Sequence, residues 1–481
     1  DILGGFCVKV CETIPMFSET LTSMLGGLTS WEVVTIGGQD AEGKDATNEL
    51  SFILLELADE LRMRQPNFHV RLHENTSKEF YDEVIRVNFG SGSAPAMYND
   101  ETIIETMMSV GYSLEDARDY VAIGCVEPTA PGKTLGSTDA GMYNMALALE
   151  MALNEGRQLG SDQQIGAKTP PVSGMASMQD VLDAYDTQVK HQLAKLRADL
   201  QKCEQFHAKH RPTPLTSATL EGCLEQGICS TQGGAKYNFS GIQGTGMATV
   251  ADSLGAIEHA VFKEGWLTME ELVGHLKDNL PDEIVRAKLQ GIDKFGNNIP
   301  EADAWMKWVG DHYSHSITAL GKNTRGGQYL AGVYSNTSHT HFGGLISATP
   351  NGRRAGETFA SGFAPENGAD KRGSTALINS MNRIDFKKFA NGINFNIKLD
   401  ASSYDCDDGK SALASMYKVY FKRHGMQVQA NMLDPKMLIE ARDNPELHPN
   451  LLIRVSGYSA YFNDLSPQMQ HEVISRSSNG A

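Results

Sequence analysis

Hydrophobic and polar residues follow two patterns along this chain, one with the spacing of short strands and the other with the spacing of amphipathic helices. The stretch WEVVTIGG (31–38) is apolar and rich in β-branched residues until it reaches two glycines, which predicts a strand that ends in a turn. In DATNELSFILLELADEL (45–61) the apolar residues recur at helical spacing, so that Leu50 and Leu57 share one face. Repeated along the chain, this alternation predicts an α/β architecture, with the chemistry in the loops that follow the strands.

Capping residues mark where two further helices begin. Ser113 stands three residues before Asp116, which predicts a capped helix followed by the short strand Val121–Ile123 and a loop. Thr268 and Glu271 form the same kind of capping box at the start of TMEELVGHLKDNLP, which ends in a helix-stopping proline.

The stretch STDAGMYNMALALEMALNEG (137–156) predicts another helix, which Thr138 or Asp139 could cap. Further on, the segment 347–370 is rich in turn-forming residues and lies between two structured parts. This segment is the one plausible domain boundary, and the chain shows no internal repeat.

Composition narrows the class of protein. With 481 residues, 41% of them hydrophobic, the chain could form one large α/β unit or two to three ordinary domains. Its formal net charge of −17 argues against nucleic acid or an anionic membrane as the main partner, but is compatible with a cationic small substrate. The sequence has no apolar run of about 18 residues that would cross a membrane, and no recognisable signal peptide.

Seven cysteines, an odd number in a large chain, fit free thiols in a reducing cytoplasm better than a disulfide framework. Three histidine pairs have spacings that could bind a metal: His207/His210, His312/His315 and His339/His341. No cysteine or acidic partner stands at a diagnostic spacing from them, so no metal site is expected. Asn336 begins one of three Asn-x-Ser matches, which carry no meaning in a cytoplasmic protein.

The pentapeptide GCVEP (124–128) is the sharpest local signal for chemistry. Cys125 lies at a loop tip after a short apolar strand, Glu127 follows two residues later, and Pro128 stiffens the turn. A thiol and a carboxylate held in this way can reach one substrate, with Cys125 as the reactive centre and Glu127 as general base or acid. A buried cysteine beside a surface glutamate is the alternative, and the pentapeptide alone does not decide between the two.

Gly457 is unexpected in its surroundings. It stands in LLIRVSGYSAYFNDLS (451–466), between an apolar stretch and an aromatic cluster. Glycine in such a place weakens packing and costs backbone entropy, so a role that a side chain would prevent is expected.

Taken together, two motifs resemble the signatures of the glycyl radical enzymes. RVSGYSAYF (454–462) is similar to the C-terminal signature of that family. GCVEP resembles the thiyl-site signature of its eliminating branch, which includes glycerol and diol dehydratases, hydroxyproline dehydratase, isethionate lyase and choline trimethylamine-lyase. Cys125 and Gly457 are 332 residues apart, similar to the spacing in that branch. The family-like stretches GGQDAEGKDATNELS, SAPAMYND, AGVYSNTSHTHFGG and NGRRAGETFASGFAP extend the resemblance over essentially the whole chain.

The resemblance implies an α/β fold in which this chain is the C-terminal part of a ten-stranded barrel, with the cysteine and glycine loops meeting inside. It implies that residues 1–348 belong to the pyruvate formate-lyase-like barrel domain and residues 349–481 form the glycine radical domain. The chain begins DILGGFCVKV, without Met, and full family members are much longer. We therefore expect a fragment, or one part of a split protein, that is not a competent enzyme by itself.

The resemblance also implies a reaction. A radical-SAM activating enzyme would form a post-translational radical on Gly457, with no bound cofactor. Glycine suits this role because the planar radical conjugates with both neighbouring peptide groups, and a Cβ would resist flattening. Gly457 then takes a hydrogen atom from Cys125, the thiyl takes one from the substrate, and Glu127 removes the proton of the substrate hydroxyl. A glutamate beside the cysteine indicates elimination rather than the acyl transfer of the pyruvate formate-lyase branch.

Choline, cleaved to trimethylamine and acetaldehyde, is the expected substrate. Diol dehydratases carry Trp-His-Asp after the cysteine loop, whereas this chain has Ser137, Thr138 and Asp139, and a threonine there resembles the choline enzyme. Trp31 and Tyr334 fall where the family places pocket aromatics, which suit a quaternary ammonium group. A plain helix cap for Thr138, and core packing for the two aromatics, remain open alternatives.

Two other functions are kept as alternatives: a glycyl radical dehydratase of glycerol, a 1,2-diol or hydroxyproline, and an inactive fragment. The expected partners are the activating enzyme and a small-molecule substrate. A homodimer in the cytoplasm is expected, with a bacterial microcompartment as a second location.

Overall fold

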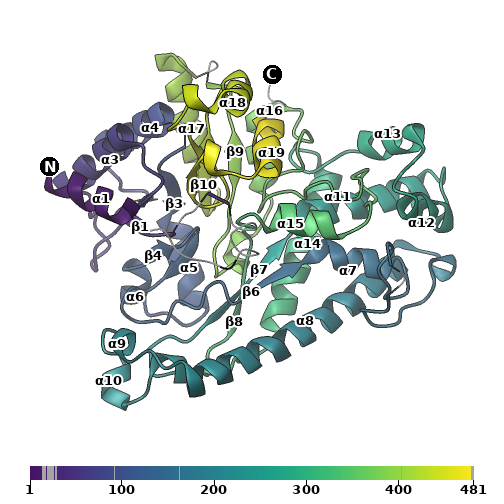
Figure 1. Ribbon diagram of the computed structural model, residues 1–481, viewed down its shortest axis with the longest axis horizontal. Coiled ribbons are helices and arrows are strands. Elements are labelled where there is room, and N and C mark those ends of the chain that lie inside the picture. The colour runs from purple at the N-terminus through teal and green to yellow at the C-terminus, as the bar shows by residue number, and fades with distance from the viewer. Residues whose placement is uncertain are drawn as a thin grey trace.

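The computed structural model describes residues 1–12, 18, 26–27, 30–91, 93–161, 163–401 and 404–477. In Figure 1 the strands lie in the interior and helices surround them, with the long helix α8 (Met178–His210) running along one side. This is the α/β arrangement that the sequence pattern predicts.

The strands are short and form two larger sheets and two hairpins. In chain order they are β1 (Val33–Gly37), β2 (Asn67–Leu72), β3 (Ala96–Asn99), β4 (Val121–Ile123), β5 (Glu127–Thr129), β6 (Gly141–Asn144), β7 (Ser240–Thr245), β8 (Tyr329–Gly332), β9 (Asn396–Lys398), β10 (Gln427–Asn431), β11 (Leu452–Arg454) and β12 (Ser459–Tyr461).

The helices separate these strands along the chain and cover them in space. Those before β7 are α1 (Ile2–Glu12), α3 (Glu49–Leu61), α4 (Lys78–Ser91), α5 (Asp100–Ser109), α6 (Leu114–Arg118), α7 (Met145–Ala152), α8, α9 (Pro214–Ser217) and α10 (Cys223–Gln226). Those after β7 are α11 (Met247–Ile257), α12 (Met269–Lys277), α13 (Glu283–Gly291), α14 (Pro300–Thr318), α15 (Ser338–Leu345), α16 (Gly373–Met381), α17 (Asp407–Lys422), α18 (Pro435–Asp443) and α19 (Pro467–Ser477). A π-helical segment, Glu258–Lys263, directly continues α11.

The two larger sheets continue one another. One has the strand order β1-β2-β3-β10-β9 and the other the order β6-β7-β8. Neighbouring strands are parallel in both, except for the antiparallel pair β3 and β10. Val333, just after β8, pairs in parallel with Ile393, just before β9, and so joins the edges of the two sheets. The strands of the two sheets therefore form one continuous layer, as expected for part of a barrel.

Several predicted elements are confirmed. The strand expected within 31–38 is β1, and the helix expected within 45–61 is α3, which begins after its N-cap Asn48. The apolar face predicted for this helix is wrong at Leu50, which is exposed, because the residues that α3 buries are Ser51, Leu55 and Ala58. Ser113 caps α6, and Val121–Ile123 is β4. The capping box expected at the start of α12 is also present.

The helix predicted over 137–156 is wrong in its first part. Gly141–Asn144 pairs with β7 as strand β6, and α7 begins only after it, with Asn144 as the N-cap. Thr138 and Asp139 therefore do not cap a helix. Pairing with a neighbouring strand overrides the local helical pattern here, as tertiary context often does.

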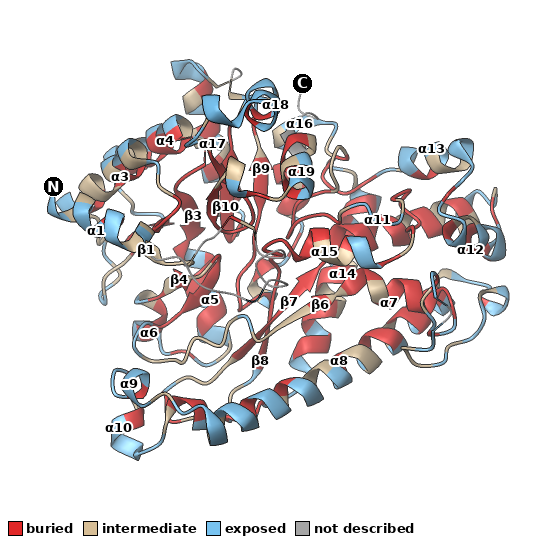
Figure 2. Cartoon of the chain, viewed as in Figure 1, coloured by how far each residue is buried: buried red, intermediate tan, exposed pale blue. Residues whose placement is uncertain are grey.

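Burial follows this arrangement. In Figure 2 the strands and the inward faces of the helices are buried, while the outer faces of helices such as α8 and α12 carry the exposed residues. Among the described residues, no helix combines the length and the hydrophobicity needed to cross a lipid bilayer.

Candidate active site

Two hairpin tips from distant parts of the chain meet inside the protein. Cys125 lies in the turn between the antiparallel strands β4 and β5, and Glu127 is the first residue of β5. Gly457 lies in the turn between β11 and β12, where the backbone N–H of Val455 donates to the carbonyl of Tyr458 at 2.9 Å. Both tips are buried, so the fold isolates them from bulk water.

Gly457 touches Cys125 so closely that no side chain fits between them. Its φ is +87°, in the left-handed region that favours glycine. A Cβ on Gly457 would lie 2.2 Å from the Cβ of Cys125 and 3.0 Å from its Sγ. The predicted meeting of the cysteine and glycine loops is therefore present, and the lack of a side chain at Gly457 is what allows it.

The Cys125 thiol is enclosed and held in its protonated form. Its side chain donates from Sγ to Oδ1 of Asn336 at 3.0 Å, and the Tyr98 hydroxyl donates to the Cys125 carbonyl at 2.8 Å. Burial, followed by the nearby carboxylates of Glu127 and Asp139, raises the pKa of the thiol well above its usual value. A protonated thiol carries the hydrogen that atom transfer requires, and a thiolate does not.

The Glu127 carboxylate is buried and fully engaged. Its Oε2 accepts hydrogen bonds from the backbone N–H groups of Cys125 (2.9 Å) and Val126 (2.6 Å). Its Oε1 accepts from the hydroxyls of Tyr334 (2.9 Å) and Thr138 (3.3 Å). Burial raises the pKa of Glu127 to about 7, against the opposing effect of the hydrogen bonds. The group can therefore gain or lose a proton near neutral pH, as a general base must.

Three of the four predicted substrate contacts gather around Glu127. Thr138 and Tyr334 bond to its carboxylate directly. Asp139 lies at the edge of this cluster, where its side chain is exposed to solvent. The protein atoms around its carboxylate still raise its pKa to about 6, because they replace part of the water that would solvate the charge. Burial thus raises the pKa of both carboxylates, and of the two only Glu127 is shielded from solvent.

Trp31 lies elsewhere, against the glycine loop. Its ring packs edge-on against Tyr458, with 6.3 Å between the ring centroids. This contact supports the loop that carries Gly457. Contact of Trp31 with substrate stays a prediction, as do the substrate roles of the other three.

Uncharged side chains hold the glycine loop in place. Asn396 donates to the Val455 carbonyl at 3.1 Å, and Asn394 donates to the Ser456 hydroxyl at 2.7 Å. Ser335 contacts the same hydroxyl at 3.2 Å. All these groups are buried, and none of them carries a charge.

Sequence reasoning missed three residues at this site, although each lies in a family-like stretch. Asn336 accepts a hydrogen bond from the Cys125 thiol, but its only local signal in the sequence is an Asn-x-Ser match. Tyr98 lies in SAPAMYND, and Arg454 opens the motif RVSGYSAYF. The Arg454 guanidinium donates from Nη2 to the Gly457 carbonyl at 2.9 Å. The resemblance could have indicated all three, but only folding shows what they touch.

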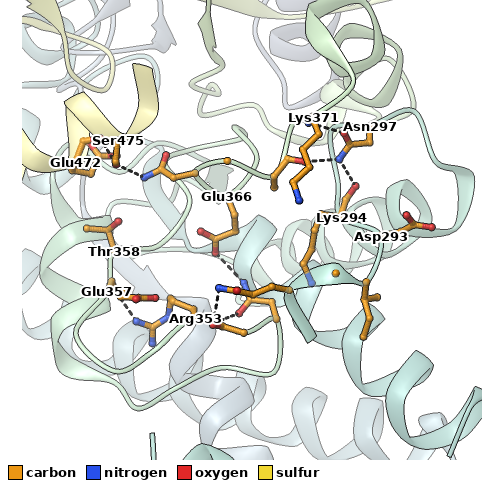
Figure 3. A pocket seen from close by; sticks show the side chains of 18 of the residues that line it. Asp293, Lys294, Asn297, Arg353, Glu357, Thr358, Glu366, Lys371, Glu472 and Ser475 are labelled. Atoms are coloured by element: carbon orange, nitrogen blue, oxygen red, sulfur yellow. Dashed lines mark hydrogen bonds between the residues drawn. The ribbon is translucent and has the colours of Figure 1, made fainter. Parts of the chain in front are cut away.

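A polar cavity of about 810 Å³ lies apart from the two loops, between residues 290–299, residues 351–372 and α19. Figure 3 shows that acidic and basic side chains share its lining, among them Glu366, Arg353 and Lys294. None of the predicted site residues lines it. The cavity therefore does not locate the reaction.

The structure also allows the histidine pairs to be placed. Among the described residues, no group of three or more His, Cys, Asp or Glu side chains is positioned to hold a metal ion. His312 contacts Asp186 at 2.9 Å, and His339 is buried with its Nε2 3.6 Å from Glu472. Both histidines thus take part in packing within the fold.

The sequence of this chain matches the models of two known protein families. Residues 1–343 match the profile of the Pyruvate formate lyase-like family, and residues 359–463, which include Gly457, match the Glycine radical domain. Fold and site thus define an enzyme class that keeps a radical on a backbone glycine, formed after translation. The chain belongs to the glycyl radical enzymes of the Pyruvate formate lyase-like family.

Several of the relatives found are named as dehydratases or sulfite-lyases. The chain is 32% identical over 450 residues to the trans-4-hydroxy-L-proline dehydratase of Clostridioides difficile, covering 93% of this chain and 57% of that protein. It is 34% identical over 455 residues to the (2S)-3-sulfopropanediol dehydratase of Klebsiella oxytoca, covering 92% and 55%. The glycerol-bound B12-independent glycerol dehydratase from Clostridium butyricum matches with a TM-score of 0.96 and 36% identity, covering 99% of this chain and 60% of that one. The chain therefore has the fold of a glycyl radical enzyme barrel and spans less than two thirds of each of these proteins.

Proposed function

We propose that the complete protein is a glycyl radical lyase, which removes a leaving group from the carbon next to a hydroxyl-bearing carbon. The contact between Gly457 and Cys125 carries this proposal, because it lets a hydrogen atom pass between the two residues. Glu127 lies beside the thiol, where a base for the substrate hydroxyl is needed. The dehydratases among the relatives support elimination as the reaction type.

The proposed steps need only these three residues. The Gly457 radical takes the thiol hydrogen of Cys125, and the resulting thiyl takes hydrogen from the hydroxyl-bearing carbon of the substrate. Glu127 accepts the hydroxyl proton, and the ketyl-like radical expels the neighbouring leaving group with its bonding electron pair. Cys125 returns a hydrogen atom to the product radical, and Gly457 returns one to the thiyl.

A hydroxyl leaving group is the substrate chemistry that the relatives favour. Two of them are named as dehydratases of hydroxyproline and sulfopropanediol, and the third is a glycerol dehydratase. In such a substrate the departing hydroxide takes the proton that Glu127 removed and leaves as water, which restores the carboxylate. Glycerol or a 1,2-diol is therefore the first substrate class to test. A hydroxylated amino acid such as hydroxyproline is the second, and there the single hydroxyl is the leaving group, so the carbon beside the ring nitrogen would have to give up the hydrogen atom.

Choline cleavage is the second candidate, and the acidic cluster supports it. Glu127 and Asp139 place negative charge beside the thiol, and the Tyr334 ring lies next to them, a combination that suits a quaternary ammonium group. In the part of the chain that the structure describes, no basic side chain forms an ion pair with either carboxylate. Thr138 stands where, by resemblance, the diol dehydratases carry a histidine.

A substrate panel tests this proposal and separates the two candidates. The complete, activated protein is incubated without oxygen with glycerol, 1,2-propanediol, trans-4-hydroxy-L-proline or choline, and the products are identified by mass spectrometry. We expect dehydration of a diol or hydroxyproline; release of trimethylamine would select choline instead. Thr138→His is the matched variant and should weaken any choline cleavage. A stable glycyl radical with no product from any of the four would contradict the proposed substrate classes.

Glu127 provides a test of the base. Glu127→Gln keeps the shape of the side chain but cannot accept a proton, so the rate should fall by at least about 10²-fold with the radical still formed. In the wild-type protein, kcat/KM should fall as pH is lowered through about 7, because protonation at the raised pKa removes the base. Anaerobic pH profiles of both proteins check this, and Glu127→Gln should lack the acidic limb. Tyr334→Phe removes a hydrogen bond that lowers this pKa, so it should move the limb to higher pH; an unmoved limb would assign it to another group.

Partners and organisation complete the proposal. The glycyl radical requires an activating enzyme, and we propose one of the radical-SAM class. We further propose a homodimer in the cytoplasm, with a bacterial microcompartment as a second location. The division into a barrel part, residues 1–348, and a glycine radical domain, residues 349–481, is also a proposal.

A further inference from the structure

Arg454 is a fully buried cation at the radical loop. Its Nη2 donates to the Gly457 carbonyl at 2.9 Å, and its Nε donates to Oε1 of Gln429 at 3.0 Å. Its Nη1 reaches Oδ1 of Asn67 at 3.4 Å and the Ser459 hydroxyl at 3.3 Å. Every one of these acceptors is neutral.

Among the described residues, no carboxylate forms an ion pair with this guanidinium. Two other buried arginines do form one: Arg71 binds Asp100 at 2.9 Å, and Arg325 lies 3.1 Å from Glu204. Arg454 forms no ion pair within the described part of the chain, and burial lowers its pKa. A buried charge without a partner destabilises a fold, so a purely structural role would be served better by a neutral side chain.

We propose that Arg454 acts electrostatically on the glycyl radical, by polarising the Gly457 carbonyl that shares the unpaired electron. This inference rests on the proposed function. A radical on the α-carbon is stabilised when the amide nitrogen donates electron density and the carbonyl withdraws it. A cation that donates a hydrogen bond to the carbonyl oxygen strengthens the withdrawal, and the low dielectric of the site preserves its effect. The missing counter-ion is then a requirement, because a carboxylate would cancel the field.

Polarisation of the carbonyl by Arg454 sets the equilibrium between a radical on Gly457 and a radical on Cys125. The guanidinium favours spin on Gly457 over spin on Cys125, so the radical rests on the glycine between turnovers. Only the gain in strength of this hydrogen bond when the carbonyl shares the unpaired electron shifts the equilibrium, and a gain of about 1.4 kcal/mol would correspond to a tenfold change. Without it, the glycyl radical should be shorter-lived, while each remaining radical reaches the thiyl state at least as readily.

Three variants test the idea in the complete, activated protein. Arg454→Met removes the charge and the hydrogen bond, and Arg454→Lys keeps the charge. Asn67→Asp leaves Arg454 in place but introduces a carboxylate beside it; the Asn67 amide nitrogen has no hydrogen-bond partner among the described residues, so the exchange removes no contact there. Asn396→Ala is the matched control, because it removes a hydrogen bond to the neighbouring Val455 carbonyl and none to Gly457.

High-frequency EPR gives a readout that a loop-holding role would not move. A cation at the carbonyl oxygen lowers the largest g value of the radical, so Arg454→Met should raise this g value and shorten the anaerobic lifetime about tenfold. Asn67→Asp should shift the g value in the same direction by less, Arg454→Lys should stay near wild type, and Asn396→Ala should show the wild-type g value.

The outcomes separate the inference from the proposed function. A wild-type protein that forms no glycyl radical contradicts the proposed function and this inference with it. A wild-type radical whose g value is unchanged in Arg454→Met contradicts the inference alone and leaves Arg454 as a loop anchor. Where Arg454→Met does not fold, Asn67→Asp decides, since an unchanged g value there has the same meaning. An equal shift in Asn396→Ala would also overturn the inference, because it would trace the effect to loop displacement.

Discussion

Cys125→Ser in the complete, activated protein should leave the glycyl EPR signal in place and reduce turnover to background. The thiol acts after the radical has formed, so its loss does not prevent activation. A serine hydroxyl fits the same buried space, but its O–H bond is too strong to give up a hydrogen atom to a glycyl radical. Anaerobic EPR spin counting, together with product formation under the same conditions, checks both halves of this expectation.

Cys223→Ser is the matched control for this experiment. Cys223 is also buried, but it lies at the start of α10, in a small cluster with Leu220 and Ala235 that is separate from the main core. Its replacement should change neither the signal nor the turnover. Residual turnover in Cys125→Ser above background would remove the role given to that thiol.

Exposure of the activated protein to air should cut the chain at Gly457. A carbon-centred backbone radical combines with oxygen, and the peroxyl product fragments the main chain at that residue, which releases the segment that begins there. Protein that was never activated has no unpaired electron at this position and should survive air intact. Ordinary proteolysis lacks this dependence, because it needs a mobile, exposed site, and the Gly457 turn is buried.

Mass spectrometry before and after exposure to air measures this cleavage. Gly457→Ala should abolish both the EPR signal and the cut, because its Cβ would lie 2.2 Å from that of Cys125 and would resist the planar radical. Gly274→Ala serves as the control, since that glycine lies in α12 with open space around it. An intact C-terminal segment despite a confirmed radical, or a cut that persists in Gly457→Ala, would place the radical elsewhere.

The long-range contact at this site was expected only because both motifs resemble those of the glycyl radical enzymes, whereas local chemistry singled out the residues one by one. A thiol and a carboxylate two residues apart indicated Cys125 and Glu127, and a glycine among aromatics indicated Gly457. The α/β class followed from the alternation of strand and helix patterns. Neither inference needed knowledge of how the loops approach each other.

Other features depend on tertiary contacts that no local pattern carries. Strand β6 was read as helix because its four residues become a strand only by pairing with β7. Asn336 and Arg454 are polar residues whose partners, Cys125 and Gly457, are fixed by the fold. Trp31 is aromatic and near the site, as expected, but its contact with Tyr458 could not be distinguished from a place in the pocket.

The close approach of Gly457 to Cys125 makes the two α-hydrogens of that glycine stereochemically different. The Cβ position that lies 3.0 Å from Sγ is the one that the pro-S hydrogen occupies in glycine. The pro-S hydrogen therefore points toward the Cys125 side chain, of which the Cβ is nearer than the Sγ, and the pro-R hydrogen points away from it. Because buried hydrogen bonds hold the loop, a planar radical at Gly457 would keep the same face toward Cys125. If Cys125 acts as proposed, the hydrogen atom that it returns should enter Gly457 at the pro-S position, which deuterium labelling of the complete, activated protein can measure.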